Sequence, residues 1–311
     1  MLCRRQRFLS IICLGALVPM FAHADEASLV AALQKTYSAC IGIDDSLSDL
    51  KKMAGINTAI TGVGTGLGVG ATVVGIVKEK TDQTIDELLR ELAEMEDDKD
   101  IPTEEQVDEW LKEYHANKDK NTTQSEIDKL TQKSKSLGYW RTGLLAGNTA
   151  TNVAGAIIAG NNRTDGDLQN QIDNCKAAIG ELRRARAQAR IDGVDVGEAN
   201  TIISACEGFE TVDISKINTR AKGAMVSSIV GATTGLTGTI TSAVANSDSI
   251  RSQKNADGTR TDKEKNLNTT SNVLAGASTV ASATATVFNA TQIKAIKDVA
   301  NVASKCTEAL K

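Results

Sequence analysis

The stretch TGVGTGLGVGATVVGIV, residues 61–77, carries no charge and has five glycines in its first ten positions. The charged segment KEK, residues 78–80, ends it. Each glycine weakens an isolated helix by about 1 kcal/mol relative to alanine, so a helix here needs close packing or a membrane to form. Gly62, Gly66 and Gly70 stand four residues apart and share one helix face, where a second backbone can approach closely. These three glycines are therefore our candidate helix-packing or membrane-facing row.

Three further stretches also lack charge, so that the set comprises residues 53–77, 142–162, 223–247 and 266–293. As helices, all four are long enough to cross the ~30 Å of bilayer hydrocarbon. Only the first is strongly apolar, because the other three are rich in Ser, Thr and Asn. We therefore predict that the four helices pack against one another in water, and we keep membrane contact as the alternative.

The fourth stretch has a pattern that predicts a buried seam and a wet face. At helical spacing, the expected seam comprises Leu274, Ala277, Ala281, Thr284 and Phe288. The expected water-facing positions are Ser278, Ser282 and Asn289. Ala also alternates with Ser or Thr over residues 280–287, which leaves a β-strand as an alternative for this segment.

The chain shows signs of an internal duplication. YSACIGI around Cys40 resembles ISACEGF around Cys206, and an INT triplet follows each. LLAGNTATNVAGAII resembles VLAGASTVASATATV, and each precedes a further cysteine, Cys175 or Cys306. We predict an all-α, elongated helical bundle of two duplicated antiparallel hairpins, in which helices rich in Gly, Ala, Ser and Thr pair closely. The first hairpin covers residues 25–182, a linker covers 183–197, and the second hairpin covers 198–311.

The first hairpin contains a charged helical insert over residues 78–136. The insert starts one helix at Thr84, breaks at residues 97–102, starts a second helix at Thr103 and suggests a third near Ile127. We expect these helices to form a small cap at one end of the hairpin. Trp110 and Tyr114 lie at helical spacing in the second helix and are our candidate partner surface.

The N-terminal segment MLCRRQRFLSIICLGALVPMFAHA has the layout of a secretory signal peptide over residues 1–24. A retained membrane anchor is the alternative, and lipidation at Cys13 is disfavoured because bulky residues precede it. An exported chain with four cysteines predicts two disulfides. The repeat pairs Cys40 with Cys175 and Cys206 with Cys306, although a pairing across the two repeats also fits the sequence.

The sequence offers little for catalysis. His115 is the sole histidine left after signal cleavage, and CxxC, GxSxG, Walker and HExxH motifs are absent. The net charge of −4 gives no reason to expect nucleic acid. We expect no metal and no cofactor. The predicted function is an exported periplasmic or envelope-associated protein with a structural or protein-interaction role and a protein partner in the envelope. The alternative is a membrane-inserting or pore-like protein that uses its glycine-rich helices.

Overall fold

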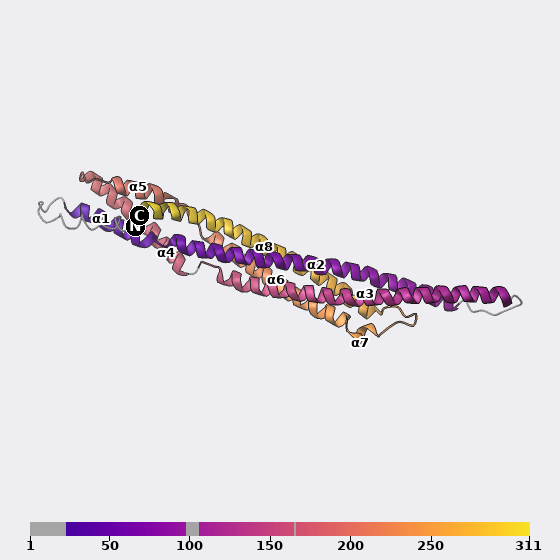
Figure 1. Ribbon diagram of the computed structural model, residues 1–311. Coiled ribbons are helices and arrows are strands. Elements are labelled where there is room, and N and C mark those ends of the chain that lie inside the picture. Colours follow the sequence, from indigo (N-terminus) through magenta and orange to yellow (C-terminus); the bar gives the residue numbers. More distant parts are fainter. Residues whose placement is uncertain (1–22, 98–105, 165) are drawn as a thin grey trace, which may run out of the picture. The chain divides into compact units, whose positions relative to one another are not determined.

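The computed structural model describes residues 23–97, 106–164 and 166–311 (Figure 1). Its elements are α1 (His23–Cys40), α2 (Ile43–Asp97), α3 (Gln106–Asn161), α4 (Gly166–Ile191), α5 (Gly197–Cys206), the 3-10 helix η1 (Glu207–Thr211), α6 (Ser215–Ala245), α7 (Asp248–Arg251) and α8 (Asp262–Leu310). Within these described ranges there is no β-strand, only an isolated bridge between Lys254 and Arg260. The prediction of an all-α helical bundle is confirmed, and the strand alternative for residues 280–287 is wrong.

The chain divides into two compact units, which we describe separately. Unit 1 comprises residues 1–51, 164–216 and 294–311, and unit 2 comprises residues 52–163 and 217–293. Each predicted hairpin contributes to both units. The predicted signal peptide, apart from its last two residues, lies outside the described residues.

Unit 1 has an ordinary apolar core and contains both disulfides. Its buried side chains include Ile43, Leu47, Ile172, Ile179, Leu182, Phe209 and Ile296. α1 packs against α4, and the side chain of Thr36 donates to the carbonyl of Ala178 across that contact. Gly193, at φ 76°, takes the left-handed conformation that ends α4 and turns the chain.

The disulfides join Cys40 to Cys175 and Cys206 to Cys306, so the predicted pairing is confirmed. The two bonds are neighbours, because the Sγ atoms of Cys40, Cys175 and Cys306 all lie within 4.8 Å of one another. Since the bonds close loops of 135 and 100 residues, each contributes about 4–5 kcal/mol to stability in the chain-entropy account.

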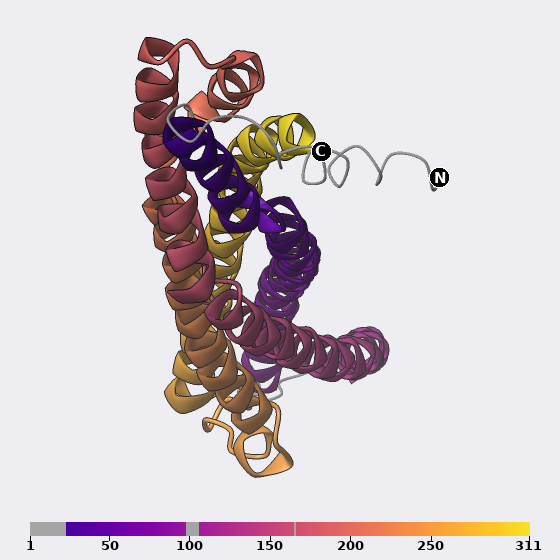
Figure 2. The ribbon, with the colours of Figure 1, turned by 90° about the vertical axis from the view of Figure 1, so that its left-hand side faces the viewer.

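Unit 2 is built from four long helical segments, supplied by α2, α3, α6 and α8 (Figures 1 and 2). α3 and α8 run parallel, because two hydrogen bonds between them, and a third from α8 to Asn162 directly after α3, all join residues 130 positions apart. The four uncharged stretches lie within these segments apart from Asn162, Asn246 and Ser247, which follow the ends of α3 and α6. Close contacts of α2 with α3 and α8, and of α6 with α3 and α8, complete the bundle.

The charged insert is helical, but it does not form a separate cap of three helices. α2 continues without a break to Asp97, and α3 runs from Gln106 to Asn161 as one helix that contains Ile127. The prediction of a third helix was wrong because Ile127 and Leu130 continue the apolar spacing of a longer helix. The predicted break at residues 97–102 falls at the end of α2 and in residues that the structure does not describe.

Candidate functional site

The outer surface of unit 2 is apolar on all four helices. Eighteen large apolar side chains of the uncharged stretches are 40–67% exposed, namely Met53, Ile56, Val63, Val69, Val73, Ile76, Val77, Val153, Ile157, Val226, Ile229, Val230, Leu236, Ile240, Val244, Val273, Val280 and Val287. We call this set the apolar belt. A water-soluble bundle buries such residues, so their position outside requires an explanation.

The threonines that share this surface satisfy their own hydroxyl groups. Thr233, Thr237 and Thr284 are exposed and Thr241 is half-buried, and each donates its hydroxyl to the backbone carbonyl four residues earlier, at 2.8–2.9 Å. A threonine bonded in this way presents mainly its methyl group to the surroundings. The threonines on the same surface as the apolar belt therefore need few hydrogen bonds from water.

The interior of unit 2 is polar where α3 meets α8. Asn148 Nδ2 donates to Ser278 Oγ at 2.8 Å, and Asn152 Nδ2 donates to Ser282 Oγ at 2.8 Å. Ser282 Oγ lies 3.0 Å from Asn148 Oδ1, and Ser278 Oγ donates to the carbonyl of Gly231 in α6 at 2.7 Å. These four side chains are at most 1% exposed. A hydrogen-bonded amide and hydroxyl network therefore occupies the place of a hydrophobic core.

Polar contacts continue toward both ends of the bundle. At one end, Asn57 donates to Asn289 at 3.0 Å and Gln292 donates to the carbonyl of Asn162 at 2.8 Å. At the other end, the hydroxyls of Thr142 and Ser242 lie 2.9 Å apart, and Ser271 donates to the carbonyl of Gly238 at 3.1 Å. Among the buried apolar residues of the uncharged stretches, every one except Leu145 is an alanine.

This arrangement contradicts most of the prediction for the fourth stretch, in which only Ala281 of the expected seam is buried. Ser278, Ser282 and Asn289, expected to face water, are fully buried, whereas Ala277 and Thr284, expected in the seam, are exposed. The physical reason is that short polar side chains fit between closely packed backbones and bond across the helices there. The seam prediction assumed instead that burial follows hydrophobicity.

The glycines that allow the close packing are one row away from Gly62, Gly66 and Gly70, for which the alternative of a membrane-facing row stays a prediction. A Cβ on Gly64 or Gly68 would approach within 2.5 Å of Thr151 Oγ1 or Thr279 Oγ1, whereas Gly62 and Gly66 have nothing within 4 Å. Gly70 faces only the side chain of Leu144. Gly64 and Gly68 therefore form the packing row, and Gly62 and Gly66 lie on the outer surface.

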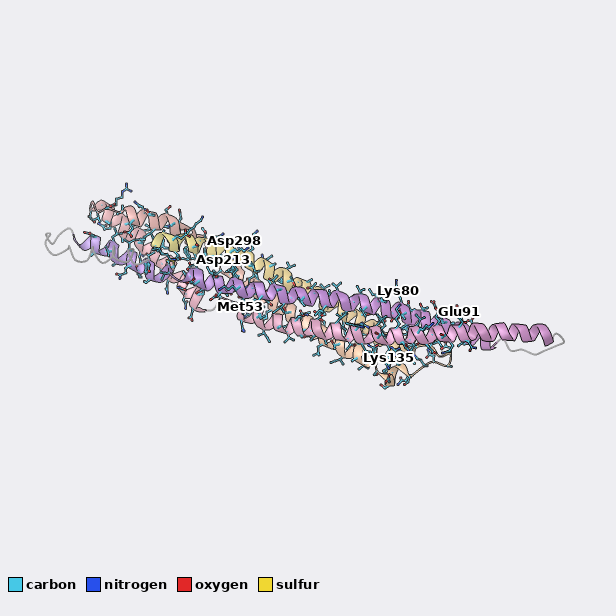
Figure 3. The ribbon with its side chains drawn as sticks, viewed as in Figure 1. Met53, Lys80, Glu91, Lys135, Asp213 and Asp298 are labelled. Carbon is cyan, nitrogen blue, oxygen red and sulfur yellow. A yellow bond between two sulfur atoms is a disulfide. The ribbon has the colours of Figure 1, made fainter. Side chains whose placement is uncertain are left out.

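Charged residues bound the uncharged stretches at the same two levels on every helix. Lys52 and Lys78 enclose the stretch of α2, and Arg141 and Arg163 enclose that of α3. In Figure 3, Met53 and Lys80 mark the two ends of the stretch on α2. The stretches of 21 to 28 residues correspond to about 30–40 Å of helix.

Two aromatic residues lie at one of these boundaries. Tyr139 and Trp140 immediately precede Arg141 and are 61% and 67% exposed. They line a shallow groove of about 430 Å³ together with Leu67, Gly143 and Leu144. Exposed Tyr and Trp at the border between an apolar zone and a charged zone are typical of the headgroup region of a bilayer.

The charged end of unit 2 is tied together by buried ion pairs. Arg260, which precedes α8, contacts Asp86 at 2.9 Å and both Asp82 and Glu79 of α2 at 3.3 Å. Lys78 Nζ lies 2.5 Å from Asp82, whose other carboxylate oxygen accepts a hydrogen bond from Ser134 of α3. The charges thus neutralise one another and fasten the segment after α7 to α2.

Burial and pairing act in opposite directions on the cations of this end. Burial lowers the pKa of Lys78, although Asp82 partly opposes that shift. Burial also lowers the pKa of Arg260, but Glu79, Asp82 and Asp86 outweigh it and raise the pKa above its usual value. Both effects are those of structural ion pairs, and neither cation is free to act on a substrate.

The core network and Gly64 and Gly68 were not among the predicted site residues. One sequence pattern pointed to these residues, because polar and apolar residues alternate at helical spacing in each uncharged stretch. The pattern does not indicate which face of the helix is buried. Trp110 and Tyr114 fall within α3, and their side chains lie outside the described part of the structure. The partner surface therefore stays a prediction.

Two helical stretches of the described chain are long and apolar enough to cross a membrane, residues 26–94 and 262–310. In the most apolar 18 residues of each stretch, only 28% and 33% are buried, whereas the core helix of a soluble protein is mostly buried. Residues 262–310 were not expected to qualify. Comparison with protein-family models, curated proteins and solved structures gives no match to this chain.

Proposed function

We propose that the protein is an exported cell-envelope protein whose unit 2 is embedded in a lipid bilayer. One observation carries the proposal: the bundle has its polar side chains inside and its large apolar side chains outside. In a bilayer this arrangement is favourable, because lipid covers the apolar belt and the buried amides and hydroxyls bond to one another. In water the same arrangement exposes apolar area that would otherwise be buried.

A bilayer fits the belt better than a second copy of the chain does. A dimer would cover one side of the bundle, whereas exposed apolar residues occur on all four helices. The belt has a length of about 30–40 Å, which matches the ~30 Å hydrocarbon layer. The exposed Tyr139 and Trp140 then fall among the lipid headgroups, while the neighbouring charged residues Lys78 and Arg141 are buried within the bundle.

The internal duplication belongs to this proposal. Gly68 of α2 and Gly235 of α6 have corresponding surroundings, since each lies against one threonine and one core polar residue of α3 and α8. Gly68 faces Thr279 and Asn148, and Gly235 faces Thr149 and Ser278. We propose that two copies of a small-residue helical hairpin pair about an approximate twofold axis to form unit 2.

The location and role follow from the same features. The disulfides of unit 1 support an oxidising compartment, as the predicted signal peptide does. With four crossings, residues 25–52, 163–222 and 294–311 share one side of the bilayer, which is the oxidising side. We propose an anchoring or scaffolding role without catalysis, in which the insert meets a protein partner.

Alkaline carbonate extraction of membranes from cells that produce the full chain tests the proposal. We expect the protein to remain in the membrane pellet. A matched pair of variants sharpens the test: Val280→Lys in the belt and Ile191→Lys in unit 1 both place a charge on an exposed apolar position. A lysine in the middle of a membrane helix costs about 3 kcal/mol, so only the first variant should be released.

Two results would contradict membrane embedding. The first is release of the wild-type protein into the soluble fraction, with a soluble oligomer on gel filtration indicating that a second copy covers the belt. The second is retention of both lysine variants in the pellet to the same extent, because the belt would then not be the surface that holds the protein.

A further inference from the structure

The polar interior of unit 2 is interrupted by one apolar layer. Ala71 of α2, Leu145 of α3 and Ala275 of α8 are fully buried and form a hydrophobic cluster. α6 contributes Gly238, whose added Cβ would lie 3.8 Å from Leu145. The layer thus takes one buried residue from each helix, Leu145 is its one large buried side chain, and the partly buried Leu144 packs against it.

Polar groups flank this layer closely on both sides. Asn148 and Ser278 follow on the side of the unit 1 connections, and Ser271 and Thr142 follow on the side of the charged end. Buried polar side chains therefore occupy much of the interior of the bundle on both sides of this layer.

Several of the buried polar atoms have no hydrogen-bond partner among the residues that the structure describes. On one side of the layer they are Asn57 Oδ1, Ser228 Oγ and Gln292 Oε1, and on the other side Asn246 Oδ1, Asn268 Nδ2 and Arg141 Nε. All six side chains are at most 4% exposed. Buried polar atoms of this kind are normally satisfied by internal water, which needs several polar partners close together.

We propose that unit 2 contains a path for water and small ions across the bilayer, closed at the layer of Ala71, Leu145, Gly238 and Ala275. The inference rests on the membrane embedding proposed above. Polar side chains on either side of the layer hold water, and the apolar side chains of the layer exclude it. A short apolar constriction blocks ions because an ion cannot keep its hydration there.

Leu145 is the residue that closes the path. The other three members of the layer are Ala and Gly, which are too small to fill the centre of four helices. A polar and smaller side chain at position 145 would let water bridge the polar residues above and below. Replacement of the leucine should therefore open the path while the α3–α8 hydrogen bonds hold the helices together.

Halide influx into vesicles tests this proposal. The oxidised full chain is reconstituted in phosphatidylethanolamine and phosphatidylglycerol vesicles that contain a halide-sensitive dye and a labelled dextran. Wild-type vesicles should be tight to iodide. Leu145→Thr should raise the rate of iodide entry by about tenfold or more, which corresponds to a modest lowering of the barrier. The dextran should stay inside, because the path admits only small ions.

The matched control is Val280→Thr, which makes a similar substitution on the lipid-facing surface. We expect it to leave the vesicles as tight as the wild-type protein does. Ala275→Ser is a second variant in the layer, of nearly unchanged volume, and should raise the iodide rate in the same direction as Leu145→Thr. It keeps the test decisive where Leu145→Thr disturbs folding.

Three results would overturn the proposal. Leu145→Thr and Ala275→Ser vesicles as tight as wild type, with the proteins resistant to carbonate, would overturn the path and leave membrane embedding intact. Equal leakage from Val280→Thr, or loss of dextran together with iodide, would show bilayer damage in place of a path. Release of the wild-type protein by carbonate would remove both proposals.

Discussion

Asn148 of α3 and Ser278 of α8 face each other across the centre of unit 2, with the amide nitrogen 2.8 Å from the hydroxyl oxygen. Neither side chain is exposed. The pair joins a larger side chain on one helix to a smaller one on the other, as Asn152 and Ser282 do one turn further along. Two asparagines would overfill these positions and two serines would leave a void. The pairing therefore favours contact of α3 with α8 over contact of α3 with a second α3 or of α8 with a second α8.

Asn148→Ala should destabilise the bundle, because Ser278 loses its amide partner and Ser282 keeps only Asn152 of its two. We expect a loss of about 1–2 kcal/mol, the range for polar contacts between membrane helices. Thermal unfolding in detergent, followed by circular dichroism, measures the loss. A double-mutant cycle with Ser278→Ala should give a coupling energy, whereas additive effects would show that the bond contributes nothing.

The two glycine rows of α2 should respond oppositely to alanine. Gly68→Ala places a Cβ 2.5 Å from Thr279 Oγ1 and 3.2 Å from its backbone Cα, so α2 must move away from α8. Gly66→Ala meets nothing within 4 Å and removes the cost of a helical glycine, for a gain of up to about 1 kcal/mol. Melting temperatures of the two variants provide the comparison. A gain in both variants would mean that α2 does not approach α8 this closely.

Removal of one cysteine should cause the disulfides to exchange. In Cys40→Ser the thiol of Cys175 is left within 4.8 Å of Cys306 Sγ. A thiolate at this distance can attack the remaining disulfide, so we expect a fraction of the protein to contain a Cys175–Cys306 bond and a free Cys206. Peptide mapping under non-reducing conditions detects the new bond. Cys40→Ser/Cys175→Ser is the control and should retain only the Cys206–Cys306 bond.

The ion pair between Lys35 and Glu181 makes the contact of α1 with α4 sensitive to acid. The hydrogen bond from Lys35, 2.6 Å from Glu181 Oε2, lowers the pKa of the Glu181 carboxyl below its ordinary value. Because the folded pKa is the lower one, the contribution is present at neutral pH and is lost as the pH falls through it. An NMR titration should show this low pKa, and Lys35→Met should return it toward the ordinary value.

Trp140 should report the bilayer interface. In vesicles its fluorescence should shift to the blue, and lipids brominated near the headgroup should quench it more than lipids brominated at the chain end. The measurement uses the Trp110→Phe variant, in which Trp140 is the sole remaining tryptophan and all tryptophan emission comes from it. An emission that is unchanged by vesicles would place Trp140 in water and count against the proposed boundary.

Much of the architecture could be predicted because it depends on local signals. Charge-free stretches of 21 to 28 residues with almost no proline indicate helices, and similar segments around Cys40 and Cys206 indicate the disulfide pairing. The extent of the helices beyond Thr84 and through Ile127 was missed, because capping signals are common inside long charged helices and do not by themselves end them.

The orientation of the helices could not be predicted, because it depends on the surroundings. The same spacing of Ser278 and Ser282 fits a wet outer face in water and a bonded inner face in lipid. The two rows of glycine in α2 are likewise equivalent in sequence, and only the partner helices decide that Gly64 and Gly68 are inside. The rule that burial follows hydrophobicity therefore placed Ser278 and Ser282 on the wrong face.

The inward turn of the polar side chains has a consequence for how such a chain could travel. While extended, the uncharged stretches of α3 and α6 mix valine, leucine and isoleucine with threonine and asparagine or serine, and only the stretches of α2 and α8 are apolar enough to cross a membrane. A translocation channel therefore has less reason to release the stretches of α3 and α6 sideways into the first membrane. The apolar belt forms a continuous surface only when the bundle folds. The unfolded chain can therefore cross the first membrane before it acquires a surface that is insoluble in water.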